Sequence, residues 1–350
     1  MTQRTLAGLL AVPLLLALWT VAVFTPLPFV TYEPGLTVDV LGDPDGEEII
    51  QVSGHRTYRD GGELRMTTVF VTQPNTDVNL FDLMEGWISP DAAVLPYSAV
   101  YQPQETQKSN EIEGAIAMVS SQDAAIAVAL TELGVEFDKA IKVFRVADGA
   151  PATGKLQPGD VVVAVNGKPV TTTEEVAAAV EATPAGAEIE FEVLRKGSER
   201  TVAVTPEAKG GEPRIGIEML PSYRFPFDVE VGIDESIGGP SAGLMFSLGI
   251  YDTLTPGSLT HGAIVAGTGT LDPDGNVGPI GGIQQKIAAA RDTGAELFMV
   301  PPENCSEALG AENGDTQLVR ADTVHDAVAA IEAWVDDPGA DLPQCSEEAA

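Results

Sequence analysis

Two short segments decide the fold of this chain: IGGPSAGLMF at residues 237–246 and GPIGGIQQKIAAA at residues 278–290. Each segment opens on glycines and a proline, which mark a turn, and continues into a pattern that predicts a helix. On a helix of 3.6 residues per turn, Ile283, Lys286 and Ile287 share one face. That face should be buried, and a buried lysine needs a chemical reason.

A serine–lysine dyad would supply that reason. A serine hydroxyl is a weak nucleophile until a neighbouring base removes its proton. Apolar neighbours, among them the isoleucines of this face and Met245, would disfavour the charged form of Lys286 and lower its pKa. We therefore predict that Ser241 is the nucleophile and that Lys286 is the general base.

The turn before the first helix has a second role in this prediction. Free backbone N–H groups at a helix start can stabilise a developing oxyanion, which makes Gly239 and Ala242 candidate oxyanion and turn residues. The structural alternative is that Ser241 only caps a helix and that Lys286 extends its amine to water. A Ser–His pair with His261 is a further alternative, but no acidic residue at a suitable position supports a triad.

The same two segments resemble the serine and lysine motifs of the Lon protease domain. Thr268-Gly269, which lies between them, is similar to the threonine–glycine step that Lon domains carry on an adjacent strand. This resemblance implies a serine endopeptidase and makes Thr268 a weaker candidate for orienting the lysine. It covers about residues 215–337. The chain departs from the Lon pattern at Gly238, because Lon domains usually carry an acidic residue before Gly-Pro-Ser.

An upstream segment, GDVVVAVNG at residues 159–167, resembles the hairpin signature of PDZ domains. The likeness covers about residues 120–206 and implies a domain that binds an extended peptide at a sheet edge. The candidate for the peptide-carboxylate loop is Leu133-Gly134-Val135. An ordinary helix-to-strand turn explains these three residues equally well.

The N-terminal run from Thr5 to Phe29 contains no charged side chain and consists mostly of Leu, Ala and Val. It is long enough to span a bilayer. With Arg4 on the cytoplasmic side, a single-pass anchor would place the bulk of the chain outside the cytoplasm. A cleaved signal peptide is the alternative. Together with the two domains, this anchor makes the chain resemble the membrane-anchored, PDZ-containing Lon-like proteases (the YlbL-like group).

The predicted fold class is therefore multidomain α+β. A transmembrane helix is followed by a β-rich spacer, a PDZ-like domain and an α/β Lon-type proteolytic domain. The expected boundaries are 1–30 for the anchor, 31–110 for the spacer subdomain, 111–206 for a helix plus the PDZ-like domain, 214–337 for the protease domain and 338–350 for a loose acidic tail.

The amino-acid composition limits which kinds of molecule the protein can bind. The chain has 52 acidic and 19 basic residues, a formal charge of −33, which argues against nucleic acid. The sequence lacks a Gly-x-x-x-x-Gly-Lys-Ser/Thr phosphate loop, so we expect proteolysis without ATP or another cofactor. Three scattered histidines form no metal motif, and no metal site is expected. The expected partners are unfolded or flexible protein substrates and the membrane, and the Lon resemblance implies that a ring-shaped homo-oligomer is possible.

The chain has two cysteines, Cys305 and Cys345. They flank the last predicted strand and helix, and an oxidising location outside the cytoplasm would favour a disulfide between them. The alternative is two free thiols. For the whole chain, the alternative to a protease is a PDZ adaptor or chaperone at the membrane that binds peptides without cleaving them, a role that would not require the Ser–Lys pair.

Overall fold

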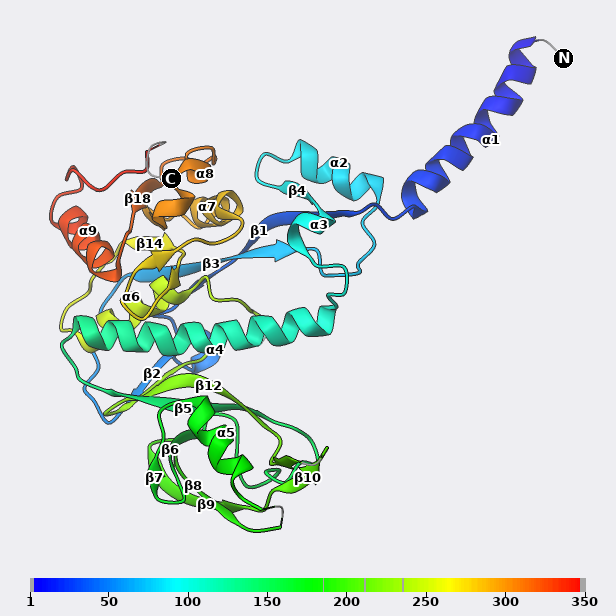
Figure 1. Cartoon of the computed structure of the whole chain (residues 1–350). Helices are drawn as coiled ribbons and strands as arrows, with labels where there is room; N and C mark the ends of the chain where they lie inside the picture. The colour runs from blue at the N-terminus through cyan, green and yellow to red at the C-terminus, as the bar shows by residue number, and fades with distance from the viewer. Residues whose placement is uncertain (1–2, 185, 211, 235, 347–350) are drawn as a thin grey trace.

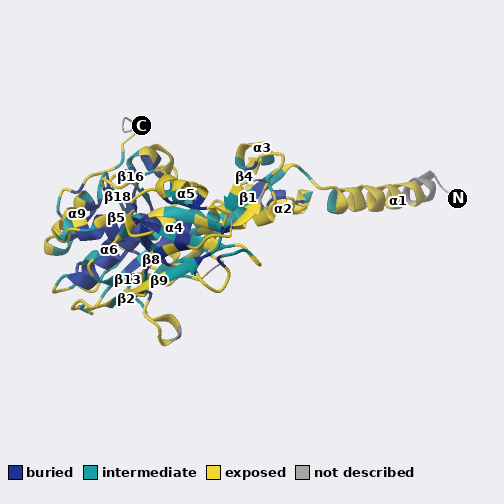
Figure 2. Ribbon diagram, turned by 60° about the horizontal axis from the view of Figure 1, so that its bottom comes forward, coloured by how far each residue is buried: buried dark blue, intermediate teal, exposed yellow. Residues whose placement is uncertain are grey.

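The computed structural model describes residues 3–184, 186–210, 212–234 and 236–346. A long N-terminal helix, α1 (Gln3–Phe24), projects from the body of the molecule (Figure 1). The body consists of a large α/β unit and, below it in this view, a smaller β-rich unit. Figure 2 shows that buried residues are concentrated in the body, whereas α1 is largely exposed from Leu9 onward.

The large unit is built on a mixed sheet with the strand order β18-β17-β14-β3-β1-β4. The three strands β14, β17 and β18 are parallel, β3 is parallel to β14, and β1 is antiparallel to both β3 and β4. The strands are β1 (Phe29–Asp39), β3 (Glu63–Val71), β4 (Ala93–Pro96), β14 (Ile264–Gly267), β17 (Leu297–Val300) and β18 (Gln317–Arg320).

Half of this sheet comes from residues 29–96, so the prediction of a separate spacer subdomain at 31–110 is wrong. Leu64 and Met66 of β3 are buried, and they pair with Val265 and Gly267 of β14. The local sequence shows that this segment is a strand. It does not show that the partner strand lies about 200 residues further along the chain.

Helices cover both faces of the sheet. Alternate residues of the central strands point to opposite faces: Leu297 and Met299 join one buried cluster, and Phe298 and Val300 join another. The first face is covered by α4 (Gln107–Glu132), α6 (Gly243–Leu254) and α9 (Val324–Asp336). The second face is covered by α7 (Ile283–Asp292) and α8 (Cys305–Ala308).

The smaller unit is a sheet with the order β12-β5-β6-β8-β9, in which β7 pairs with β6. It has its own core around Ile141, Val176 and Phe191. Its elements are β5 (Asp138–Val146), β6 (Val161–Val165), β7 (Lys168–Pro169), α5 (Thr173–Glu181), β8 (Ile189–Arg195), β9 (Ser198–Val204) and β12 (Ile217–Arg224). A small hairpin, β10 (Glu207–Lys209) and β11 (Glu212–Arg214), lies between the expected boundaries of the PDZ-like domain and the protease domain.

Two expected boundaries of this unit are wrong. The strand β12, assigned from the sequence to the protease domain at 214–337, pairs with β5 along its whole length, from Ile217–Val146 to Arg224–Asp138. The helix at the start of 111–206, α4, packs instead in the core of the large unit beside α6. The smaller unit is therefore inserted between α4 and β13, and its first and last residues, Asp138 and Arg224, are adjacent.

The remaining elements are short and connect the larger ones. The strand β13 (Asp228–Val231) pairs with β2 (Ile50–Ser53), and β15 (Thr270–Leu271) pairs with β16 (Val277–Gly278). Two 3-10 turns lie at Pro44–Gly46 and Pro302–Asn304. The helices α2 (Leu80–Ile88) and α3 (Tyr97–Val100) flank β4.

Of the described helices, α4 is long and apolar enough to cross a membrane, but half of its apolar window is buried in the molecule. It is a core helix of the large unit. In α1, the stretch Leu9–Phe24 is a shorter apolar helix. Most of its large apolar side chains, from Leu9 to Phe24, are exposed. The chain thus carries an exposed apolar helix next to its N-terminus.

Candidate active site

Ser241 lies in the turn that leads into α6. Gly239 has φ +96°, a conformation that favours glycine and lets the chain reverse before the helix. The helix itself starts at Gly243 with Ala242 as its N-cap, and no side chain caps it. Ser241 is therefore not a capping residue, and its hydroxyl is available for another role.

Two anchors on α4 hold this turn. The N–H of Gly239 donates to the carbonyl of Gly114 at 2.9 Å, and Ser121 Oγ donates to the carbonyl of Pro240 at 3.0 Å. A Cβ at Gly238 would lie 3.3 Å from the backbone of Gly114, so a side chain there would press against α4. This close approach favours glycine at position 238.

The carbonyl of Ser241 is fixed from the opposite side. It accepts hydrogen bonds from Gly269 N at 2.8 Å and from Thr268 Oγ1 at 2.9 Å. Both residues follow directly after β14, at the C-terminal end of this central strand. The threonine–glycine step thus attaches the nucleophile loop to the sheet.

Lys286 reaches the same point from the other face of the sheet. The helix α7 begins after Gly282, which has φ +69°, and Lys286 lies one turn into it. Its side chain is 2% exposed. Nζ lies 2.7 Å from Ser241 Oγ and 2.9 Å from Thr268 Oγ1. The structure therefore brings together Ser241, Lys286 and Thr268, the three residues that were predicted from the sequence.

The electrostatics of this cluster favour a neutral lysine. Burial disfavours the ammonium form and lowers the pKa of Lys286 to about 7. In the described part of the chain, no carboxylate lies within ion-pair distance of Nζ to restore its charge. At neutral pH a large fraction of Lys286 is thus available to accept a proton.

A groove of about 560 Å³ opens beside the dyad. The second half of β3 forms one wall, and β14 pairs only with residues 63–66 of this strand, so residues 67–71 have one free edge. Phe70 and Leu36 line the groove with side chains that are more than half exposed. The segment from Ser236 to Ala242 also lines the groove.

His261 is not part of this site. It is exposed, and its backbone N–H bonds to Ser258 Oγ. It lies before the first residue of β14, whereas Thr268 follows the last one. The strand separates His261 from the dyad, so the Ser–His alternative is not formed.

The predicted peptide-carboxylate loop has a structural role. Leu133 ends α4, Gly134 has φ +70°, and the N–H of Val135 bonds to Leu130 at the helix C-terminus. Leu133 and Val135 pack against the core of the large unit. These contacts are those of an ordinary helix-to-strand turn. The edge strands of the smaller sheet are β12 and β9, and both α4 and α5 contact β12.

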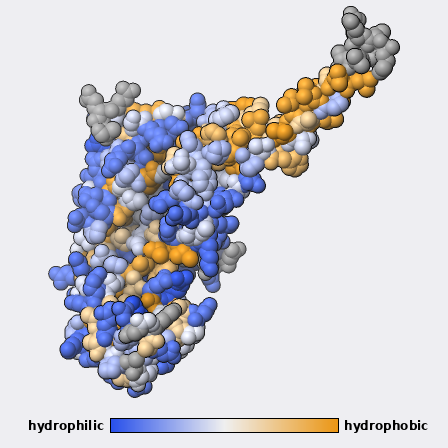
Figure 3. Space-filling model, turned by 45° about the vertical axis from the view of Figure 1, so that its right-hand side comes forward, coloured by the Kyte–Doolittle hydropathy of each residue, from blue (hydrophilic) through white to orange (hydrophobic). Residues whose placement is uncertain are grey.

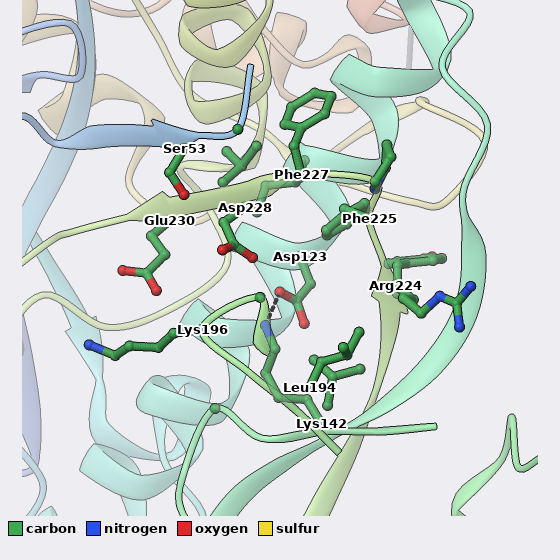
Figure 4. A pocket seen from close by; sticks show the side chains of 18 of the residues that line it. Ser53, Asp123, Lys142, Leu194, Lys196, Arg224, Phe225, Phe227, Asp228 and Glu230 are labelled. Atoms are coloured by element: carbon green, nitrogen blue, oxygen red, sulfur yellow. Dashed lines mark hydrogen bonds and ion pairs between the residues drawn. The ribbon is translucent and has the colours of Figure 1, made fainter. Parts of the chain in front are cut away.

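A polar cluster that was not predicted from the sequence lies between the large unit and the smaller unit. The carboxylate of Asp123 on α4 is buried and pairs with Lys142 Nζ of β5, and it accepts a 2.7 Å hydrogen bond from Ser222 Oγ of β12. Figure 4 shows this ion pair in a pocket between the units, near Phe225 and Phe227. The available signal was a charged residue on an otherwise apolar helix face.

Cys305 and Cys345 form a disulfide that closes a separation of 40 residues. Leu342 is 4% exposed, and the carbonyl of Pro343 accepts a hydrogen bond from Arg320 N. The segment 338–346 is therefore packed on the large unit, and the prediction of a loose tail is wrong for these residues. Residues 347–350 lie outside the described part.

Comparison with known proteins identifies two domains in the chain. Residues 116–205 match the family model of the PDZ domain, and residues 234–317 match that of the Lon protease (S16) C-terminal proteolytic domain. The structure divides the chain differently at two points, because α4 packs in the protease unit and β12 completes the PDZ sheet.

Several curated proteins are similar to parts of the chain. Lon protease of Campylobacter concisus is 31% identical over 119 residues, which is 32% of this chain and 14% of that protein. Lon protease 2 of Bacillus subtilis is 32% identical over 111 residues, 32% of this chain and 18% of that protein. Zinc metalloprotease RasP of Geobacillus kaustophilus is 38% identical over 76 residues, 22% and 18% of the two chains. The chain spans less than a fifth of the length of these relatives.

The fold and the site define a serine peptidase of the Lon type. The chain combines a segment that matches the Lon-type proteolytic domain with an inserted segment that matches the PDZ domain, and in these parts it is similar to Lon proteases. In the residues that the structure describes, no cluster of three His, Cys, Asp or Glu side chains is arranged to hold a metal ion.

Proposed function

We propose that this protein is a membrane-anchored endopeptidase that uses the Ser241–Lys286 dyad to cleave unfolded or flexible segments of exported proteins without ATP. The observation that carries the proposal is the 2.7 Å contact between Lys286 Nζ and Ser241 Oγ in a buried site. A PDZ adaptor that only binds peptides would not require this contact.

The neutral amine of Lys286 takes the proton of Ser241 as Oγ attacks the carbonyl carbon of the scissile peptide bond. When the C–N bond breaks, the ammonium returns this proton to the leaving amine, and Ser241 carries an acyl ester. A water molecule then attacks the ester and gives a proton to Lys286. Collapse of the second tetrahedral intermediate releases the acid, and the proton returns to Ser241.

Thr268 orients the base in this scheme. Its hydroxyl donates to the carbonyl of Ser241, so its oxygen is free to accept one N–H of Lys286. That contact directs the lone pair of the neutral amine toward Ser241. Thr268 is thus proposed as a positioning residue.

Backbone N–H groups supply the oxyanion donors. Those of Ser241 and Ala242 form no hydrogen bond to any other described group, whereas the N–H of Gly239 is used by Gly114. We assign the oxyanion role to Ser241 and Ala242, and a turn role to Gly239. Two free donors next to the nucleophile are the arrangement that acyl transfer requires.

The groove supports the proposed preference for unfolded substrates. A peptide must be extended to add to the free edge of β3 beside the dyad, and a folded chain cannot present its backbone in this way. Phe70 and Leu36 offer apolar contacts to its side chains. The chain has no phosphate-loop motif, so we propose that substrates arrive already unfolded.

In this proposal, the PDZ domain and α1 bring substrates to the active site. A peptide would add to the edge strand β12 next to α5, while binding at Leu133-Gly134-Val135 stays a prediction. The apolar helix α1 would span the bilayer with the N-terminus in the cytoplasm. The disulfide supports an oxidising location for the body of the protein.

Hydrolysis of a labelled unfolded protein tests the proposal. The full chain, reconstituted in phosphatidylcholine nanodiscs, is incubated with a reduced, alkylated and fluorescein-labelled protein, with and without ATP. We expect fragments at equal rates in both cases and none with Ser241→Ala. Binding without cleavage by the unaltered chain would support the adaptor alternative, and a rate that requires ATP would contradict the proposed independence from it.

A further inference from the structure

We propose that α2 lies in the headgroup region of the same bilayer that α1 crosses, so that the protease is held against the membrane at two points. The proposal rests on the anchoring role given to α1 above. Its own evidence is the surface of α2, which exposes large apolar side chains although it belongs to the folded body.

The apolar face of α2 is defined by five residues: Leu80, Phe81, Met84, Trp87 and Ile88. Their exposed fractions run from 37% for Leu80 to 77% for Ile88. At 100° per residue they cover one continuous arc of about 120°, while Asp82 and Glu85 share the remaining polar side. A soluble helix would place such an arc against the core.

The apolar face of α2 does not pack on the protein, because the opposite side of the helix already packs there. Leu83 is 1% exposed, and a Cβ on Gly86 would lie 2.8 Å from the Val94 side chain of β4. The helix therefore packs closely on the sheet edge. Its N-terminus is closed by a capping box between Asn79 and Asp82. The apolar face is thus held outward in one orientation.

The apolar face continues directly into α1. The two helices are in contact, and the ring of Trp87 packs edge-on against Phe29, the first residue after the α1–β1 connection, with centroids 6.4 Å apart. Phe24, the last residue of α1, is 75% exposed. Figure 3 shows apolar side chains extending from α1 onto the adjoining surface of the body.

This continuity selects a lipid surface as the occupant. A helix that crosses a bilayer brings everything near its end to the headgroup level, where tryptophan and other amphipathic rings are enriched. Amphipathic helices bind there with the apolar side toward the acyl chains and the charged side toward water. The chain carries a formal charge of −33, so apolar contact and not attraction to anionic lipid must provide the binding.

Docking of α2 would set the height of the active site. The strand β1 starts beside Trp87 at Phe29 and passes Tyr32 and Leu36, both of which line the groove of the dyad. At about 3.3 Å per residue, these positions are roughly 10 and 23 Å along the strand from Phe29. The groove would therefore face chain segments that leave the membrane.

Tryptophan fluorescence can test α2 and α1 separately, because the chain has three tryptophans, Trp19, Trp87 and Trp334. Each is kept alone by changing the other two to Phe, and the full chain is reconstituted in phosphatidylcholine vesicles with or without brominated acyl chains. Bromine quenches only indoles that reach the acyl region. Trp19 reports on α1, Trp87 on α2, and Trp334 on α9 serves as the control.

We expect brominated lipid to reduce the fluorescence of Trp19 and Trp87 and to leave Trp334 unchanged. Quenching of Trp19 without quenching of Trp87 would overturn the docking of α2 while leaving the anchor intact. Quenching of neither would overturn the anchor as well. If Trp87 is shielded from aqueous iodide but not quenched by brominated lipid, a protein surface covers α2, and the lipid proposal is wrong.

A charged variant provides a second readout. Phe81→Glu with Ile88→Glu changes only exposed side chains, so it should fold, and we expect it to abolish quenching of Trp87 while that of Trp19 persists. The matched control is Leu309→Glu, which alters another exposed apolar residue, on the α8 side of the molecule, and should leave both signals unchanged. Equal quenching of Trp87 in all three proteins would contradict the role of the apolar face.

Discussion

Ser121 and Asp123 lie two residues apart on α4, yet they hold different parts of the molecule. Ser121 donates to the carbonyl of Pro240, next to the nucleophile, and Asp123 binds the first and last strands of the PDZ domain. One turn of a core helix thus contacts both the catalytic loop and the inserted domain. Any displacement of this turn would reach Ser241 through a single hydrogen bond.

Ser121→Ala should therefore reduce turnover without contacting substrate. The change leaves the carbonyl of Pro240 without its donor, at a cost of about 1–3 kcal/mol, and loosens the nucleophile loop. We expect kcat to fall by about tenfold, with a smaller change in KM, since misplacement of a catalytic group acts on the chemical step. Ser120→Ala, on the neighbouring position, is the matched control. Unchanged kcat in Ser121→Ala would show that the loop is held by its other contacts.

The dyad should behave as one unit. Ser241→Ala and Lys286→Ala should each abolish cleavage, and the double variant should be no slower than either single variant, because each change removes the same step. Steady-state kinetics on one peptide would measure this, with circular dichroism to verify folding. Near-normal turnover in Lys286→Ala would identify a different base.

The buried lysine should make activity rise with pH. With the pKa of Lys286 lowered to about 7, the neutral form increases through pH 6–8, and kcat should follow with a midpoint near 7. Flat kcat between pH 5.5 and 9, a range chosen around that pKa, would exclude Lys286 as the base.

The same pKa shift has a consequence for stability. An unfolded lysine binds its proton up to a pKa near 10.5, so between about pH 7 and 10.5 the unfolded state holds more protons and stability rises with pH. Below pH 7 the folded state bears the full cost of a buried ammonium. Lys286→Met should therefore be inactive but more stable than the unaltered protein at pH 6, with the difference shrinking as the pH rises. Thermal unfolding at several pH values measures this, and lower stability of the variant at pH 6 would contradict it.

Removal of the disulfide should weaken the C-terminal part of the protease domain. Closing a 40-residue loop contributes about 3–4 kcal/mol in the chain-entropy model, and Cys345→Ser would lose that amount. Denaturant unfolding of the variant, compared with the unaltered protein under oxidising and reducing conditions, gives the value. The two proteins should coincide when both are reduced, and a difference that persists in reductant would point to packing of the serine instead.

The sequence predicted the dyad because its signals were local. Each signal lies within about ten residues of sequence: a lysine on the apolar face of a short helix, and a serine directly after Gly-Gly-Pro. The residues of strands β3 and β12 were assigned to the wrong units, because alternation of side chains does not specify the pairing partner of a strand. Asp123, like Lys286, is a charged residue on a buried helix face. This pattern indicates that α4 contacts another part of the protein at that point, which is the junction with the PDZ domain.

The PDZ domain is inserted within the protease unit, so it can be removed without separating the two ends of the surrounding chain. Asp138 and Arg224 are paired neighbours in the ladder, so residues 139–223 can be replaced by a short Gly-Ser linker without separating the ends. The contact between the rings of Phe137 and Phe225, with centroids 5.3 Å apart, remains at the junction. Asp123 would lose both partners, and the excised variant therefore also carries Asp123→Asn.

We expect the excised protease to cleave a short peptide with unchanged kcat and to show a KM for long unfolded substrates that is raised by about tenfold or more. A captured chain is held near Ser241 at high effective concentration, and that advantage disappears with the domain. The control is the full chain with Asp123→Asn alone, which separates loss of capture from damage to α4. An unchanged KM on long substrates, in a variant that still cleaves the short peptide, would mean that the PDZ domain does not deliver substrate to the dyad.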